Sequence, residues 1–322
     1  MNSSHKQTLG IDFGGTSIKL AVVNERGEIE ARARRETRTI GTIEAWLDAV
    51  ADAVAEMGYP SNRLGAELGG IGVGVPGFVD FGRGFIHELV NVPGWVSVPL
   101  VRLLEERFGL RAVVDNDVNA MAIGESAFGV GKLYAHAVFV TLGTGVGGAI
   151  LIDHRLYRGA HSMAGEIGHV SIDRQGIPSP QGRGGLEQYI GNRQISARVV
   201  RGIEEGRMPG LSRRAAGDLA GITPAWLAAA AQEGDPDAIA EFDYVADCLA
   251  TAFASITYLI QPSVFIVGGG VAQSGEILFD PLRRHLRERL SPFFAERIEV
   301  RPAQLGNDAG VIGAATLAAL ES

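Results

Sequence analysis

Three glycine-rich turns, each directly after an apolar strand pattern, are the features of this sequence best suited to binding phosphate. They are Gly14-Gly15-Thr16, Gly143-Thr144-Gly145 and Gly268-Gly269-Gly270. Without a Cβ atom the backbone can approach an anion closely and direct N–H groups at it. The first two turns each join two β-rich runs, which predicts hairpins and not the strand-to-helix turn of a Rossmann site. No G-x-x-x-x-G-K-[ST] segment occurs, which excludes a P-loop.

Two carboxylates, Asp115 and Asp117, follow a predicted strand at 112–114, between the first two turns. Alternation along a strand places both on the same side, so both are candidates for the base that accepts a proton from an attacking hydroxyl in phosphoryl transfer. We favour a strand-end or helix-capping role for Asp115. Two threonine hydroxyls, at Thr16 and Thr144, would add hydrogen bonds to a triphosphate, and Asp12 would hold Mg²⁺ through water.

The elements that must position these groups form a pattern that occurs twice along the chain. Strand, glycine turn and strand appear at 8–23 and again at 137–152, which predicts two related α/β halves. An irregular stretch at 159–192 is long enough to be functional. Further strands are predicted at 70–75 and 263–267, and helices at 43–57, 99–108, from 224, from 236 and at 311–320.

Composition limits the class of protein. A chain of 322 residues with 46% hydrophobic residues can bury two cores, and its net charge of -8 argues against nucleic acid as a partner. Lys19 is interpreted as a solvated strand lysine. The one cysteine, Cys248, excludes an internal disulfide and suits a buried helix position. With no apolar run of membrane length and no signal-peptide core, we expect a cytoplasmic protein with no membrane partner.

Several segments in a fixed order resemble the motifs of the sugar kinase/Hsp70/actin superfamily. Asp12 to Lys19 resembles its phosphate-1 motif, Gly143 to Gly148 its phosphate-2 motif, and Val267 to Val271 its adenosine motif. Within that superfamily, Asp115 to Ala120 and the signature Gly165-Glu166-Ile167-Gly168-His169 resemble the ROK family of repressors and sugar kinases. The resemblance extends from Leu9 to Leu320.

The resemblance implies an α/β, two-domain actin-like ATPase (ribonuclease H-like) fold, with a mixed sheet and flanking helices in each half and an active site in the interdomain cleft. Its domains would be 1–118 plus 306–322, and 119–305. It implies an ATP- and Mg²⁺-dependent kinase for the 6-hydroxyl of a hexose, glucose first, and a homodimer formed through the second domain. Asp117 would be the base. The implied sugar ligands are Gly77, Asn91, Asn116, Glu166, His169 and Glu187. The implied nucleotide-binding residues are Asp12, Gly14, Gly15, Thr16, Gly143, Thr144, Gly145, Gly268, Gly269 and Gly270.

The chain departs from the family pattern after His169. Many relatives carry a C-x-C-G-x-x-G-C segment there that binds structural zinc, whereas residues 179–187 contain no cysteine. Thiolates make such a cage tight, so we predict no zinc and assign no residue as a direct metal ligand, and His161 is interpreted as a loop residue. Alternative functions are an N-acylhexosamine kinase, for example for N-acetylmannosamine, and a sugar-binding protein without catalysis. A DNA-binding repressor is disfavoured, because the first strand pattern begins near Thr8.

Overall fold

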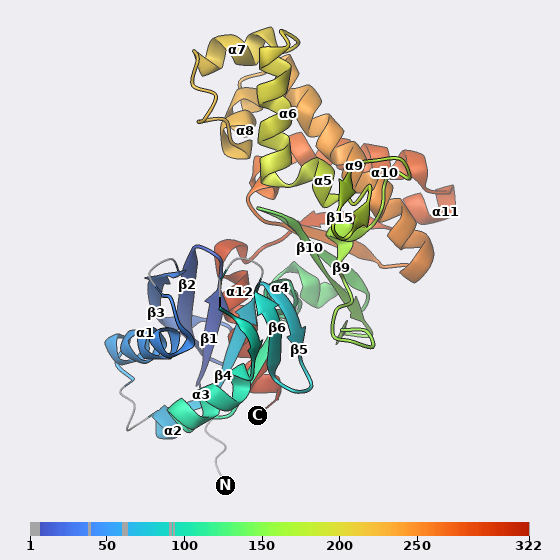
Figure 1. Ribbon diagram of the computed structural model, residues 1–322. Coiled ribbons are helices and arrows are strands. Elements are labelled where there is room, and N and C mark those ends of the chain that lie inside the picture. Colours follow the sequence, from blue (N-terminus) through green and yellow to red (C-terminus); the bar gives the residue numbers. More distant parts are fainter. Residues whose placement is uncertain (1–6, 38–39, 60–63, 90–91, 93, 322) are drawn as a thin grey trace. The chain divides into compact units, whose positions relative to one another are not determined.

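The protein, described here by a computed structural model of residues 7–37, 40–59, 64–89, 92 and 94–321, divides into two compact units (Figure 1). Unit 1 comprises Met1–Leu133, His154–Ala164 and Gln304–Ser322, and unit 2 comprises Tyr134–Asp153 and Gly165–Ala303. The helix that follows Asn116 therefore packs with unit 1, whereas the sequence analysis begins the second domain at residue 119.

Unit 1 is built on a mixed sheet of five strands in the order β3-β2-β1-β4-β8, with β1 to β3 antiparallel and β1, β4 and β8 parallel. A smaller antiparallel sheet has the order β5-β6-β7. The strands of these sheets are β1 (Gln7–Phe13), β2 (Ser17–Val23), β3 (Ile29–Glu36), β4 (Leu68–Val75), β5 (Gly77–Asp80), β6 (Phe85–Leu89), β7 (Val96–Val98) and β8 (Ala112–Asn116). The short strand β11 (Arg155–Tyr157) belongs to neither of them. The helices are α1 (Ile43–Glu56), α2 (Leu64–Glu67), α3 (Leu100–Phe108), α4 (Asp117–Phe128) and α12 (Ala309–Leu320), with 3₁₀ turns at η2 (Val130–Leu133) and η5 (Gly306–Asp308).

Unit 2 repeats the hairpin in a sheet where β10, β9, β14 and β15 lie side by side in that order. Its strands are β9 (Ala137–Leu142), β10 (Val146–Ile152), β12 (Pro178–Ser179), β13 (Gly182–Arg183), β14 (Val264–Gly268) and β15 (Glu299–Pro302). Its helices are α5 (Glu187–Ile190), α6 (Asn192–Glu204), α7 (Pro209–Ala215), α8 (Pro224–Gln232), α9 (Pro236–Ile260), α10 (Glu276–Arg289) and α11 (Pro292–Ala295), with 3₁₀ turns at η3 (Ile167–His169) and η4 (Val271–Ser274). Both predicted hairpins are present.

The main sheet of unit 1 has one face of large residues and one face of glycine. On β4, Ile71 and Val73 are fully buried in a core with Trp46, whereas Gly72 and Gly74 alternate with them. A Cβ at Gly72 would collide with the carbonyl oxygen of Ala314 on α12. Strand alternation therefore turns a Gly-x-Gly sequence into a surface against which helix backbones pack directly.

Helices α4 and α12 pack against each other as closely as they approach the sheet. A Cβ at Gly313 would collide with the carbonyl oxygen of Ala120, and one at Gly124 would lie 2.7 Å from the carbonyl oxygen of Ala309. Figure 1 shows α12, in red, among the blue and cyan elements of unit 1. The chain end thus completes the first unit and fixes α4 on it.

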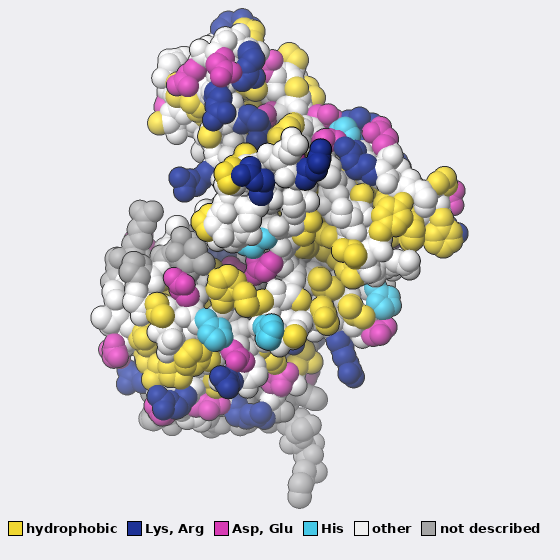
Figure 2. Space-filling view, turned by 45° about the vertical axis from the view of Figure 1, so that its right-hand side comes forward, with side chains coloured by type: hydrophobic (Ala, Val, Ile, Leu, Met, Phe, Trp, Pro, Cys, Tyr) yellow, Lys and Arg dark blue, Asp and Glu magenta, His cyan; other side chains and the backbone are white. Residues whose placement is uncertain are grey.

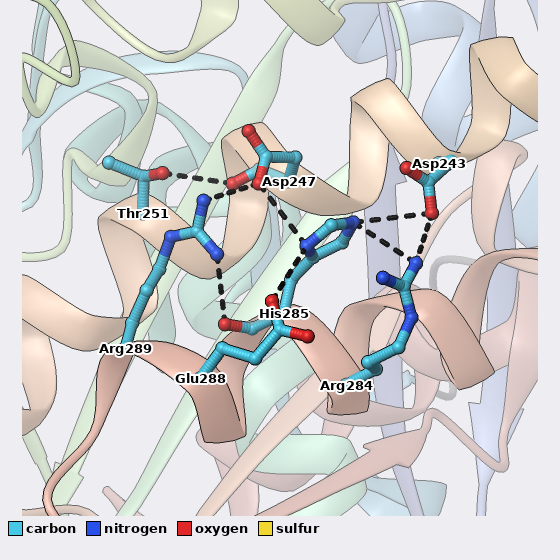
Figure 3. Close-up of polar contacts among 7 residues, drawn as sticks. All are labelled: Asp243, Asp247, Thr251, Arg284, His285, Glu288 and Arg289. Carbon is cyan, nitrogen blue, oxygen red and sulfur yellow. Dashed lines mark hydrogen bonds and ion pairs between the residues drawn. The ribbon is translucent and has the colours of Figure 1, made fainter.

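The core of unit 2 includes the interface between α9 and α10, and Cys248 lies in it as expected, 6% exposed. Burial raises the pKa of this thiol to about 11. A polar cluster joins the same two helices (Figure 3): His285 of α10 lies 3.2 Å from Asp243 Oδ1 and 3.3 Å from Asp247 Oδ1, both on α9. Arg284 pairs with Asp243, and Arg289 with Asp247. No predicted site residue belongs to this cluster.

Charges of both signs share the surface. On the face shown in Figure 2, Lys and Arg side chains are interspersed with Asp and Glu, also over the helices α6 to α8 at the top of the view. In the part of the chain that the structure describes, no helix has both the length and the hydropathy to cross a membrane.

The close packing of α12 on Gly72 predicts that adding one methyl group at this position lowers the stability of the protein. Gly72→Ala is expected to lower the free energy of unfolding by roughly 1–3 kcal/mol, because an overpacked helix–sheet contact must separate. Gly41→Ala is the matched control, since nothing lies within 4 Å of a Cβ at that position. Thermal and urea unfolding of both variants measure the difference. Equal stabilities would contradict the close packing of α12 on β4.

Candidate active site

The first predicted phosphate turn joins β1 to β2 in unit 1. The N–H of Gly14 donates to the carbonyl of Ser17 at 3.0 Å, and the Thr37 hydroxyl donates to the carbonyl of Gly14 at 2.7 Å. Thr16 is exposed at the tip. Among the described residues, nothing accepts a hydrogen bond from the N–H groups of Gly15 or Thr16. These hydrogen bonds therefore fix the conformation of the turn, and the N–H groups of Gly15 and Thr16 remain as donors for an anion.

Asp12 lies just before this turn, and its side chain is 18% exposed. The hairpin register pairs it with Lys19, whose Nζ lies 3.0 Å from Asp12 Oδ2 and also donates to the carbonyl of Asn307 at 3.1 Å. Lys19 is a strand lysine with a side chain that is 38% exposed, as interpreted, and its ammonium group also pairs with Asp12. An ammonium group beside the turn adds a positive charge that the glycine motif alone does not supply.

Asp115, one of the two candidate bases, has a structural role. It is 1% exposed, and its Oδ2 accepts from Arg158 Nε at 2.8 Å and lies 2.7 Å from Nη2. Its Oδ1 accepts from the side chain of Asn119 at 2.8 Å and from the N–H of Asn116. A buried carboxylate with both oxygens occupied is not available to take a proton from a substrate. Of the two favoured roles, Asp115 has the one at the strand end, because the helix cap is Asn116.

Asn116 and Asp117 form the junction between β8 and α4. Asn116 is the N-cap, and its Oδ1 accepts from the N–H of Val118 at 2.9 Å. Its side-chain amide lies 3.4 Å from the carbonyl of Gly77. Asp117, the first helical residue, is partly exposed and its Oδ1 also accepts from the N–H of Val118. The structure thus brings three predicted residues of unit 1 to one place.

Gly77 has a conformational reason for being glycine. Its φ is 133°, and a Cβ there would collide with the carbonyl oxygen of Glu88. Asn91, the remaining sugar ligand predicted in the first domain, lies outside the described residues.

The second phosphate turn joins β9 to β10 in unit 2. The N–H of Gly143 donates to the carbonyl of Gly145 at 2.9 Å, and Thr144 is exposed. Glu187, predicted as a sugar ligand, also supports this turn: its Oε2 accepts from the N–H of Val146 at 2.8 Å, and a Cβ at Gly145 would collide with that oxygen. One carboxylate therefore links the sugar segment to the phosphate turn within unit 2.

The third turn, Gly268 to Gly270, follows β14. Gly268 pairs with Thr141 of β9, and Gly269 has φ of 89°. A Cβ at Gly269 would collide with the carbonyl of Leu142, the residue before the second phosphate turn. Parallel pairing of β14 and β9 thus brings two of the three predicted nucleotide-binding turns together.

Glu166 and His169 flank the 3₁₀ turn η3. Glu166 Oε2 lies 3.8 Å from His169 Nε2. Partial burial raises the pKa of the Glu166 carboxyl, His169 lowers it and Glu187 raises it. Ile167 and Gly168 between them are buried, and a Cβ at Gly168 would collide with the carbonyl of Val146. The signature segment is therefore seated on β10, with its two polar side chains directed away from the core.

The segment from 165 to 192 is ordered by hydrogen bonds. The N–H groups of Ile172 and Leu186 donate to the carbonyls of Gly184 and Val170 at 2.9 and 3.0 Å. The N–H of Ile177 donates to the hydroxyl of Tyr189 at 3.1 Å. Within the described ranges, no three His, Cys, Asp or Glu side chains gather in a way that would hold a metal ion.

No sequence pattern identified Arg158, Thr37 or Tyr189 as part of this site. Arg158 and Asp115 are 43 residues apart, and no local pattern marks either as the partner of the other. Lys19, in contrast, faces Asp12 across a two-stranded hairpin that the sequence did predict, so strand pairing carried the signal.

Comparison with known proteins agrees with these observations. The model of the ROK family matches residues 8–321. The chain belongs to the ROK family, and the predicted two-domain α/β fold class of the actin-like ATPases is confirmed.

Relatives with a named activity match over nearly the whole chain. A glucokinase of Streptomyces coelicolor is 36% identical over 315 residues, 97% of this chain and 97% of its own length. One of Halalkalibacterium halodurans is 35% identical over 313 residues, 96% and 94% of the two chains. The structure of a ROK family glucokinase from Streptomyces griseus in complex with glucose and AMPPNP is similar with a TM-score of 0.80 and 36% identity, covering 97% of this chain and 98% of that one.

The hydrogen-bonded segment from 165 to 192 predicts a protein whose stability does not depend on zinc. Elemental analysis of the purified chain is expected to find zinc well below one atom per chain, because the thiolate ligands of a tight site are absent. Treatment with EDTA is expected to leave the melting temperature of the ligand-free protein unchanged. Stoichiometric zinc, or a melting temperature that falls with EDTA, would contradict this prediction.

Proposed function

We propose that this chain is an ATP-dependent sugar kinase that transfers the γ-phosphoryl group to the 6-hydroxyl of a hexose, with glucose as the first substrate to test. The single observation that carries the proposal is the difference in exposure between the two carboxylates at the β8–α4 junction. The Asp115 side chain is buried, whereas Asp117 is partly exposed next to Asn116, whose amide reaches the carbonyl of Gly77. The glucokinase relatives, one of them with glucose and AMPPNP, support the same chemistry.

Asp117 is proposed to accept the proton of the 6-hydroxyl as that oxygen attacks the γ-phosphorus and the bond to the bridging oxygen of ADP breaks. Its place in the first turn of α4 favours the carboxylate form needed for this step. Asn116 and Gly77 would contact the sugar from unit 1. Asn91 is proposed for the same role on the family resemblance alone.

From unit 2, three side chains are proposed to contact the sugar: Glu166, His169 and Glu187. Carboxylate and imidazole groups pair with hydroxyls, and a sugar that leaves such a group unpaired binds less well, which gives selectivity. Because Glu187 also holds the N–H of Val146, sugar contact and the shape of the phosphate turn depend on one residue.

The turns fit a nucleotide by their chemistry, because Thr16 and Thr144 are exposed and the N–H groups of Gly15 and Thr16 have no acceptor among the described residues. Gly14, Gly15 and Thr16 are proposed to bind phosphate from unit 1, and Gly143, Thr144 and Gly145 from unit 2. Gly268, Gly269 and Gly270 would bind the adenosine. Mg²⁺ held by Asp12 through water would neutralise triphosphate charge.

We also propose that the two units close on the substrates and exclude water, which prevents wasteful ATP hydrolysis. A homodimer through unit 2 and a cytoplasmic location complete the proposal, and no nucleic acid is part of it.

Removing the proposed base is expected to abolish turnover while leaving binding intact. Asp117→Asn keeps the size and the cap geometry, so the rate of glucose-dependent ADP release should fall by about 10²–10⁴-fold. AMPPNP affinity, measured by calorimetry, should stay close to wild type. Asp52→Asn on the exposed face of α1 is the matched control. Phosphorylation at the wild-type rate by Asp117→Asn would assign the base elsewhere, and absence of ADP release by wild type with every hexose and N-acylhexosamine tested would refute the kinase.

The raised pKa of Glu166 predicts the pH dependence of sugar binding. A raised carboxyl pKa means that the group gains its proton at a higher pH than an ordinary glutamate, so its acceptor role is lost earlier as pH falls. The KM for glucose is expected to rise on the acid side, whereas in Glu166→Gln it should be higher and flatter with pH. The same shift favours the folded state as pH falls, so acid unfolding at this group does not explain the rise. Steady-state kinetics from pH 8 to pH 5 test this, and identical profiles for both proteins would contradict it.

A further inference from the structure

The chain passes between the two units four times, after Leu133, Asp153, Ala164 and Ala303. Any change in the relative placement of the units must be accommodated at these connections, because the interior of each unit is packed. What holds the connections therefore determines how the units move.

Glu125 of α4 holds two of the connections. It is 0% exposed, and its Oε1 accepts from the N–H groups of Gln304 at 2.8 Å and Leu305 at 2.6 Å. Its Oε2 accepts from the N–H of Val130 at 3.2 Å. Gln304 is the first residue after one connection, and Val130 begins the short turn that ends at Leu133 before another.

This carboxylate is expensive to bury. No Lys, Arg or His among the described residues forms an ion pair with Glu125. Burial raises its pKa although three backbone N–H groups favour the charged form. An uncompensated buried charge lowers stability, and an apolar residue would fill the space at less cost. Only a two-oxygen acceptor, however, can join the two separate backbone segments at one point.

The other two connections enclose residues 154–164, and Arg158 fastens that segment. Its guanidinium pairs with buried Asp115 and lies 3.6 Å from the ring centroid of Phe81. Both acidic anchors lie on adjoining elements, because Asp115 is the last residue but one of β8 and Glu125 lies in α4, which follows β8 directly. Asp117 lies between them in the sequence.

We propose that Glu125 and Asp115 are positioning residues that fasten the connections between the units to β8 and α4. When the two units close on the substrates, Asp117 would then keep its position on unit 1. The inference rests on the proposed kinase function for its catalytic consequence. The anchoring itself consists of contacts within the chain and does not depend on bound substrates.

Single-molecule energy transfer tests the anchoring without reference to activity. In a Cys248→Ala chain, dyes are attached through Arg102→Cys on α3 and Arg213→Cys on α7, two exposed positions on different units. Glu125→Ala is expected to broaden the distance distribution of the ligand-free protein, and Glu125→Gln to broaden it less. The amide keeps one acceptor for Gln304 and Leu305 but directs an NH₂ group at the N–H of Val130.

Kinetics then separate positioning from general destabilisation. Val50→Ala, which removes a buried side chain of α1 from a core cluster that contains no residue of a connection, is the control for lost stability. At a temperature where all variants are folded, Glu125→Ala is expected to lower kcat and to raise KM for both glucose and ATP, each by about tenfold, while Val50→Ala keeps both values. Arg158→Lys should broaden the distribution as Glu125→Gln does.

Glu125 variants with the distribution and kinetics of Val50→Ala would overturn the proposal, because the carboxylate would then contribute stability alone. Absence of sugar-dependent ADP release by the wild type would refute the kinase instead. In that case the comparison of distance distributions still decides whether Glu125 anchors the connections.

Discussion

The direct contact of α4 and α12 with a glycine-lined sheet face is the constraint on which the rest of unit 1 depends. A Cβ at Gly74 would lie 3.4 Å from the Cα of Asp117, so the first residue of α4 is seated on β4 with no side chain between them. The backbone of the proposed base therefore packs directly on the backbone of β4. Such a contact is more rigid than one made through a layer of side chains. Small residues along α12 extend the same contact, because Ala314 and Ala315 lie against Gly72 and Gly10 of the sheet.

Features that depend on neighbours in sequence were predictable. Both hairpins, the proline-started helices and the strand that ends at Asp115 follow from local periodicity and turn chemistry, and the structure has them where they were expected. The sites predicted on glycine turns could be located for the same reason. The different roles of Asp115 and Asp117 were only partly predictable. Strand alternation places both carboxylates on the same side, and only their burial in the structure distinguishes them.

Features that depend on distant partners were not predictable. Glu125 bonds to residues 179 and 180 positions away, and Arg158 to a carboxylate 43 positions away. From the sequence, Glu125 is one polar residue in a helix of small and apolar ones, and nothing local shows that both its oxygens serve backbone N–H groups. The second role of Glu187 was hidden likewise, because the sequence pattern identifies a segment and not the atoms that it supports.

An acidic protein that binds an anionic nucleotide must control the charge of its own carboxylates. In unit 1, Lys19 neutralises Asp12 and Arg158 neutralises Asp115. In unit 2, one oxygen of Glu187 accepts a hydrogen bond from a backbone N–H, and Glu166 lies next to His169. Asp117 lies in the first turn of α4, where the positive end of the helix stabilises negative charge. The side chain proposed to take a proton thus lies at a helix terminus and is partly exposed, directly after the strand that carries buried Asp115.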